Sequence, residues 1–184
     1  KDTLSYSISG NLIHNCKHGI YVNGSPATIK RGTISSNTIH TVASFGIHWD
    51  AGACNVTGNL IDGYGDVDSG SITDKAVIFM AGAGAGSVVN GNVMMNGIHG
   101  LVLNSNPSGF VVGDNVVRPS CTGYGLYFVG FTGSDIALSN NQLDAASGPG
   151  VNQPANLAQI GNGTQSTVGA AGSASALPAT PAGY

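Results

Sequence analysis

The sequence has no glutamate, and charged residues make up only 8% of it. Any carboxylate chemistry must therefore come from aspartate. Lysine and arginine together number six and the formal net charge is −3, so the chain lacks the basic stripe that binds nucleic acid, and we expect no nucleic-acid partner. No apolar run approaches the length needed to cross a bilayer, so we expect no membrane-spanning segment either.

Cysteine is scarce as well. Cys16, Cys54 and Cys121 are odd in number, and their spacing fits neither a zinc site nor a disulfide framework. We expect small buried side chains, with at least one thiol unpaired. The chain also lacks room for a capping element, because its repeats start within a few residues of Lys1. We therefore expect it to be a piece of a longer protein.

What the sequence contains in quantity is a repeated phrase. An Asn flanked by aliphatic residues is followed by a short turn and then by a glycine with an aliphatic run, as in Gly19-Ile-Tyr-Val22. Apolar residues stand two apart within the phrase, which is typical of strands. The repeated Asn residues are Asn11, Asn37, Asn59, Asn92, Asn115 and, more loosely, the pair Asn140 and Asn141.

The spacing of these phrases predicts an all-β fold, a parallel β-solenoid of about six coils. We place the solenoid in residues 1–152. Residues 153–184, rich in Gly, Ala, Ser and Pro, are expected to form an extended tail or linker. The Asn at the same corner of every coil tolerates left-handed turn geometry, and its amide can bond its counterpart one coil away.

Stacked coils turn sequence positions into spatial columns, because equivalent residues of adjacent coils lie about 4.8 Å apart. The aliphatic residue two places after each Asn is expected to point inward, so the residue three places after it points outward. We expect Trp49 in the core, since it shares the inward register of Val22 and Phe79. The outward column after the Asn reads His14, His40, Asp62, Met95, Arg118 and Asp144, and the outward column after the glycine reads Tyr21, His48, Ile78, Val102 and Tyr127.

Both columns place titratable or aromatic side chains on the first three coils. They lie beside an insertion in the third coil, which covers residues 62–75. A ridge of His, Tyr and Asp beside a loop is the shape of a carbohydrate groove, since sugars need planar apolar faces to stack on and polar groups for their hydroxyls. A solvated solenoid face without function is the alternative. The candidate substrate-binding residues are Tyr21, His14, Asp50, Tyr64 and Arg118.

Hydrolysis of a glycosidic bond would need two carboxyl groups, one acting as acid and the other as base or nucleophile. The candidates are Asp50, Asp62, Asp66 and Asp68. Carboxylates on adjacent coils would lie roughly 5 Å apart, the retaining separation, and those two coils apart roughly 9 to 10 Å, near the inverting one. Asp66 and Asp68 also fit a polar loop or a weak calcium site, and we expect no other metal or cofactor.

Elimination on an acidic polysaccharide would instead need a base beside a carboxylate that a cation neutralises. His40, His48 or Tyr21 could serve as the base. Lys17, Arg31 or Arg118 could neutralise the sugar carboxylate. His18 and His99 each stand just before a glycine, where a turn residue bonded to the backbone is the commoner role.

The Ile-x-x-Asn-x-Ile phrases paired with Gly-Ile-Tyr-Val strands resemble the right-handed parallel β-helix of the pectate lyase-like superfamily. The resemblance covers about four fifths of the chain and implies a right-handed, single-stranded parallel β-helix. Lyases, polygalacturonases, epimerases, tailspike depolymerases and non-catalytic adhesins share such repeats. The Asn-Thr-Asp, Gly-His-Gly and Arg-Ile-Lys motifs of polygalacturonases and the Asp-Pro-His-Asp motif of alginate epimerases are missing.

The closing segment from Ala176 to Tyr184 is similar to the part of phage tail proteins that leads from a β-helix into a terminal strand. This likeness implies the C-terminal part of a tailspike-like polysaccharide depolymerase, typically a homotrimer outside the cell or on the virion surface. The resulting expectation is a polysaccharide-binding β-helix with hydrolase or lyase activity. The alternative is a non-catalytic receptor-binding or structural module.

Overall fold

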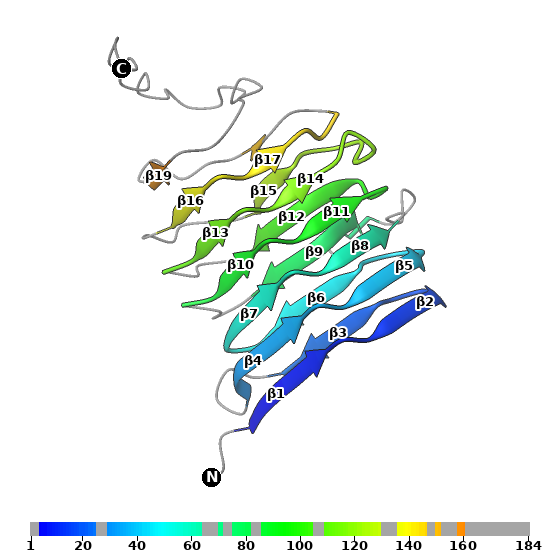
Figure 1. Ribbon diagram of the computed structural model, residues 1–184, viewed down its shortest axis with the longest axis vertical. Helices are drawn as coiled ribbons and strands as arrows, with labels where there is room; N and C mark the ends of the chain where they lie inside the picture. Colours follow the sequence, from blue (N-terminus) through cyan, green and yellow to red (C-terminus); the bar gives the residue numbers. More distant parts are fainter. Residues whose placement is uncertain are drawn as a thin grey trace.

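The strands of the chain wind into a stack of coils that rises from the N-terminal end in Figure 1. The computed structural model describes residues 4–24, 29–63, 70–71, 75–81, 86–104, 109–129, 136–146, 150–151 and 158–160. Within these ranges the strands form three sheets, and three consecutive strands of the chain belong to three different sheets. Each strand pairs in parallel with its neighbours in its own sheet. The predicted all-β parallel β-solenoid is confirmed.

Each coil contributes one strand to every sheet, so neighbouring strands in a sheet are three apart in chain order. Sheet A contains β1 (Leu4–Ser9), β4 (Ile29–Ser35), β7 (Ala53–Thr57), β10 (Val88–Asn90), β13 (Val111–Gly113), β16 (Ala137–Ser139) and β19 (Ala158–Ile160). Sheet B contains β2 (Leu12–Cys16), β5 (Thr38–Val42), β8 (Leu60–Gly63), β11 (Val93–Met95), β14 (Val116–Val117) and β17 (Gln142–Leu143). Sheet C contains β3 (Ile20–Asn23), β6 (Ile47–Asp50), β9 (Ala76–Ala81), β12 (His99–Asn104), β15 (Leu126–Val129) and β18 (Gly150–Val151).

The predicted Asn ladder stands at the corner between sheets A and B. From Asn11 to Asn115, each ladder amide donates from Nδ2 to the Oδ1 of the next ladder Asn at 2.9 Å. The same Oδ1 accepts a second bond from the backbone N–H of the preceding ladder Asn, at 3.0 to 3.1 Å. From Asn37 to Asn141 these bonds satisfy polar groups that are almost fully buried, and along the whole ladder they hold the coils in register. The ladder consists of Asn11, Asn37, Asn59, Asn92, Asn115 and Asn141.

One detail of the ladder differs from the prediction. The left-handed conformation belongs to the residue before each ladder Asn, because this residue makes the turn while the Asn side chain reaches into the stack. Four of these positions in the described coils carry Gly or Asn, the residues that adopt positive φ at least cost. The turn residues are Gly10, Ser36, Gly58, Gly91, Asp114 and Asn140, with φ between 50° and 67°.

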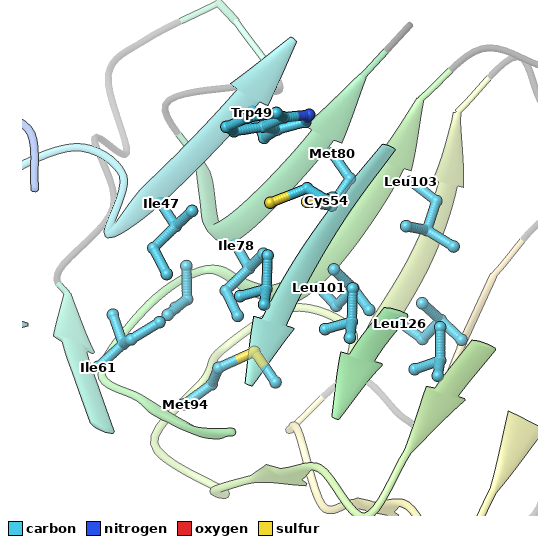
Figure 2. Packing of buried hydrophobic residues seen from close by; sticks show 14 of the residues in the cluster. Ile47, Trp49, Cys54, Ile61, Ile78, Met80, Met94, Leu101, Leu103 and Leu126 are labelled. Atoms are coloured by element: carbon cyan, nitrogen blue, oxygen red, sulfur yellow. The ribbon is translucent and has the colours of Figure 1, made fainter. Parts of the chain in front are cut away.

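The core fills the space between the three sheets, and Figure 2 shows part of it. The aliphatic residue two places after each ladder Asn points inward as predicted; Ile39, Ile61 and Met94 are fully buried. Each such side chain contributes roughly 1.5 to 3 kcal/mol relative to an exposed one. Trp49 is also fully buried, as predicted, and its Nε1–H donates to the Gly52 carbonyl at 2.6 Å.

Two of the cysteines behave as predicted fillers. Cys54 and Cys121 are buried, Cys16 is half-buried, and all three thiols are free. Burial raises the pKa of the Cys54 thiol to about 12 and also raises that of Cys121. Both buried thiols therefore stay protonated and inert at neutral pH.

Of the predicted tail at 153–184, only β19 lies within the described residues, where it adds a strand to sheet A beside β16. No helix in the described ranges is long and apolar enough to span a membrane.

Candidate functional site

The outward side of sheet B carries the predicted column of titratable side chains, here called the sheet B column. Parallel pairing places His14 opposite His40, His40 opposite Asp62, and Asp62 opposite Met95. The two imidazole rings stack with their centroids 5.2 Å apart and their planes within 8°. His14 is exposed, while His40 and Asp62 are half-buried. The column continues through Arg118, which is exposed, to Asp144, which is half-buried.

Asp62 is held by a neighbour from the next coil. Its Oδ1 accepts a hydrogen bond from the Asn96 side-chain amide at 2.7 Å, and this bond fixes the carboxylate beside His40. In its own column, among the described residues, its neighbours are a histidine and a methionine and not a second carboxylate. The described part of the site therefore offers an imidazole next to a carboxylate and not the carboxyl pair of a glycosidase.

The outer side of sheet C carries a second surface, here called the aromatic face. Two columns of rings run along it, one on the strands of sheet C and one at the corner that leads into them. The strand column contains Tyr21, His48, Phe79, Val102 and Tyr127. The corner column contains His18, Phe45, Ala76, His99 and Tyr124.

Rings at the N-terminal end of the aromatic face form one continuous cluster. His18 stacks on Phe45 with centroids 4.3 Å apart, and Phe45 contacts both Tyr21 and His48 at 5.4 and 5.2 Å. His48 in turn packs against Phe79 at 4.9 Å. Tyr21 is 55% exposed, whereas His48 and Phe79 are only 7% and 3% exposed. Tyr21 is therefore the ring of this cluster that a ligand reaches most readily.

A second cluster lies at the other end of the aromatic face. His99 stacks on Tyr124 with planes 5° apart, and Tyr127 contacts both rings at 4.8 and 5.9 Å. The two tyrosines are half-buried and His99 is buried. His99 Nδ1 accepts a hydrogen bond from the backbone N–H of Tyr124 at 3.1 Å, which is the backbone role expected for it.

The protonation state of His99 follows from its surroundings. Burial lowers its pKa below the ordinary value of 6.5, and the positive charge of Lys75 lowers it further. The ring is therefore neutral at pH 7, with its proton on Nε2, because Nδ1 is the acceptor.

One predicted register is wrong. Phe79, and not Ile78, stands opposite His48 and Val102 on the outer side, and Ile78 points into the core opposite Ile47 and Leu101. The cause is the restart of the third coil after the insertion. The sequence suggests that Ala76 takes the position of the strand glycine in the other coils. It pairs instead with His99, the residue just before the strand glycine Gly100. Met80, not Phe79, therefore shares the inward column of Trp49.

The other predicted site residues are distributed as follows. Asp50 ends β6, is half-buried and stands opposite Asn23 on the rim of the aromatic face. Its backbone carbonyl accepts a hydrogen bond from the Gly24 N–H at 2.8 Å. Tyr64, Asp66 and Asp68, together with the calcium site considered for the two aspartates, lie outside the described residues.

The corner column contains rings that the sequence analysis did not assign to a site. His18 and His99 were expected only as turn residues, and Phe45 and Tyr124 had no assigned role. The sequence does carry a signal for them, because an aromatic or His residue directly precedes the strand glycine in His18-Gly19, Phe45-Gly46, His99-Gly100 and Tyr124-Gly125. The glycine is required there, since a Cβ on Gly46 would lie 2.2 Å from Ile61 and 2.8 Å from the Val77 carbonyl.

In the described ranges, no group of three or more His, Cys, Asp or Glu side chains is placed to hold a metal ion.

Comparisons with known proteins agree with this architecture. Residues 2–155 match the family described as "Right handed beta helix region". No curated protein and no solved structure is significantly similar to the chain. The family match covers most of the chain and has the same repeating parallel strands, so this protein belongs to the right-handed β-helix family.

Proposed function

We propose that this protein binds a polysaccharide along the aromatic face. The observation that carries the proposal is that each of the first five coils places at least one ring on this face, in the strand column or in the corner column, from Tyr21 in the first coil to Tyr124 and Tyr127 in the fifth. Sugars stack on flat aromatic rings, and a row of rings suits a ligand that is itself a repeating polymer. The two accessible ends lie roughly 19 Å apart, four coil spacings of about 4.8 Å.

Polar groups beside the rings suit the same ligand. The Tyr21 hydroxyl accepts a hydrogen bond from the Asn23 side-chain amide at 2.9 Å, so the phenol keeps its own proton for a sugar hydroxyl. Asp50 stands next to Asn23 in the adjacent coil and adds an acceptor. Lys75 directly precedes β9, the strand that the third coil contributes to sheet C, and adds a donor near His99. A ring flanked by a small number of fixed polar groups is the usual composition of a carbohydrate site.

A second candidate function is depolymerisation, favoured by the sheet B column. His40 and Asp62 are adjacent, half-buried, and oriented by Thr41 and Asn96 respectively, as a base and its supporting carboxylate would be. Within the described residues, this pair fits elimination better than two-carboxylate hydrolysis. Asp66 and Asp68 remain candidates for a second carboxylate, and His48 remains a candidate base despite its burial.

The wider proposal is a tailspike-like protein of the pectate lyase-like superfamily, acting outside the cell or on a virion surface and assembling as a homotrimer. Support comes from the family of right-handed β-helices and from the low charge of the chain. Light scattering on the purified chain measures the predicted assembly directly; a monomer at all concentrations would exclude the trimer.

Binding is tested by titrating the full chain with a panel of capsular and other bacterial surface polysaccharides. We expect at least one to bind, and Tyr21→Ala to weaken binding by about tenfold, corresponding to about 1.4 kcal/mol. Tyr6→Ala is the matched control, because Tyr6 is a 43% exposed tyrosine of the same coil but lies on sheet A. Equal losses in the two variants, or no ligand in the panel, would remove the aromatic face as the site.

Catalysis is tested on the same panel by following reducing ends and the absorbance of unsaturated sugars. Elimination produces both signals, and hydrolysis produces reducing ends alone. His40→Ala and Asp62→Asn should each lower the rate at unchanged thermal stability, because both side chains point outward. Retained binding with neither signal would leave a receptor-binding or structural module.

A further inference from the structure

His14 and His40 form a pair whose geometry calls for an explanation apart from sugar binding. They occupy the same position in adjacent coils, both point outward, and their rings lie parallel with centroids 5.2 Å apart. Sugar stacking uses one open ring face, but here the two imidazole faces cover one another. The groups that remain available at the edges of the rings are nitrogen atoms, which are ligands for transition metals.

Thr41 supplies a second observation at the same place. It adopts φ 57°, a left-handed conformation that is a genuine outlier for a β-branched residue. At the equivalent corner position the first and fourth coils have Asn15 and Asn96, which reach φ 55° and 56° at less cost. What distinguishes Thr41 is its hydroxyl, which lies 3.2 Å from His40 Nδ1.

This contact defines which nitrogen of His40 is available. When the ring carries its proton on Nδ1, the N–H donates to Thr41 Oγ1 and the lone pair is on Nε2. Histidines that bind metals commonly donate their other N–H to an oxygen in this way, and the partner fixes both tautomer and ring orientation. A strained residue whose hydroxyl can accept the Nδ1 proton is therefore consistent with a ligand role for His40.

We propose that His14 and His40 bind a divalent transition metal ion, such as Cu²⁺, Ni²⁺ or Zn²⁺, through one nitrogen of each imidazole. Water completes the coordination shell, so the site needs no third protein ligand. Asp62, one coil further along the column, adds a negative charge that favours a cation, while its Oδ1 stays bonded to Asn96. The stacked rings must rotate to converge, and the exposed His14 side chain has room to do so.

The preference among metals follows from the ligands. Imidazole nitrogen suits Zn²⁺, Ni²⁺ and Cu²⁺, and the general order of affinities places Cu²⁺ highest. Ca²⁺ and Mg²⁺ prefer oxygen and should not compete. Because a protonated imidazole cannot bind a metal, affinity should fall as the pH is lowered.

The test is calorimetric titration of the full chain, without a histidine tag, with Cu²⁺ and with Zn²⁺. One ion should bind per chain, and His14→Ala or His40→Ala should each weaken Cu²⁺ binding by at least about tenfold. His18→Ala is the matched control, since this residue belongs to the same coil but stacks on Phe45 and should leave affinity within about twofold. Cu²⁺ coordinated by imidazole also gives a visible absorption band that the two ligand variants should lose.

Thr41 is a positioning residue, and its role is tested separately. Thr41→Gly removes the hydroxyl without opposing the left-handed backbone, and should weaken metal binding by about tenfold. Thr41→Ser retains the hydroxyl and should restore affinity. Unchanged affinity in His14→Ala and His40→Ala, equal losses in His18→Ala, or no binding of Cu²⁺ would overturn the proposal. Polysaccharide binding at the aromatic face is measured independently and does not depend on this outcome.

Discussion

The corner between sheets A and B and the corner between sheets B and C both turn the chain from one sheet to the next, but they use different residues to do so. At the corner between sheets A and B, all six described coils use one turn residue at positive φ followed by a ladder Asn, and this Asn is buried in every coil after the first. At the corner between sheets B and C, the residues change from coil to coil, and positive φ occurs only at Asn15, Thr41 and Asn96 among the described residues of that corner.

The corner between sheets A and B holds the coils together, and the corner between sheets B and C carries side chains of the candidate sites. A buried amide must bond its neighbours, so the ladder allows one residue type. The other corner is held by close approach of the backbone at glycine, and the adjoining side chains point outward. The side chain before this glycine therefore differs from coil to coil, as in His18, Phe45, His99 and Tyr124, while the strand register is kept. Both candidate surfaces adjoin this variable corner.

The largest expected effect comes from cutting the ladder. Asn92 Oδ1 accepts two hydrogen bonds from Asn59, and its Nδ2 donates to Val56 and to the next ladder amide. Asn92→Ala should lower the free energy of unfolding by about 3 kcal/mol or more, because several buried polar groups lose their partners. Urea denaturation measures the change.

The matched control is the same substitution at the other corner. Asn96 is half-buried and its amide makes one hydrogen bond, to Asp62. Asn96→Ala removes this bond and places alanine at φ 56°, so it should cost about 1 to 2 kcal/mol. If the two substitutions destabilise equally, the ladder is not what distinguishes the corners.

An intermediate effect is expected from glycines, which serve different purposes at the two corners. A Cβ on Gly46 would overlap Ile61 and the Val77 carbonyl, so Gly46→Ala should cost about 1 to 3 kcal/mol through overpacking. A Cβ on Gly58 meets nothing within 4 Å, but φ is +63°, so Gly58→Ala should cost about 1 kcal/mol.

Asparagine separates the two causes, since it tolerates positive φ but is larger than alanine. Gly58→Asn should be less costly than Gly58→Ala, and Gly46→Asn more costly than Gly46→Ala. The melting temperatures of the four variants test this ordering, and the reverse order at either position would contradict the assignment.

The smallest expected effect concerns the pH dependence of stability at the corner between sheets B and C. The pKa of His99 is lowered in the folded chain by burial and by Lys75, so the unfolded chain binds the proton more readily. The resulting stability is present above pH 6.5 and is lost as the pH falls through the lowered pKa of the folded state. His99→Gln should therefore lose less stability than the parent between pH 7.5 and pH 5, measured as the shift in melting temperature. Parallel acid limbs would show that His99 is not protected from protonation.

How far the sequence predicts the structure depends on the same two corners. The ladder and the inward columns are predictable because every coil repeats them, and repetition turns spacing into register. The sheet B column from His14 to Met95 is predictable for that reason. The register at Phe79 is not, because an insertion precedes it and Ala76 looks, in the sequence, like an alanine at the position that glycine occupies in the other coils.

The corner column was missed for a different reason. In the sequence, His18 and Tyr124 each stand alone before a glycine, and nothing there relates one to the other. Their role in the aromatic face appears only when the coils are stacked and the rings contact one another. Burial was also unpredictable from the pattern. His48 and Phe79 occupy outward positions but are nearly as buried as the core, which alternation of side chains alone does not reveal.

The central claim is that the aromatic face is where this β-helix holds a polysaccharide. A crystal structure of the protein with an oligosaccharide from a polymer that binds would test it most directly. Sugar rings should lie over Tyr21 and beside Tyr124 and Tyr127, with the oligosaccharide running along the axis of the coils. Sugar bound on the outer side of sheet A, with the aromatic face empty, would contradict it.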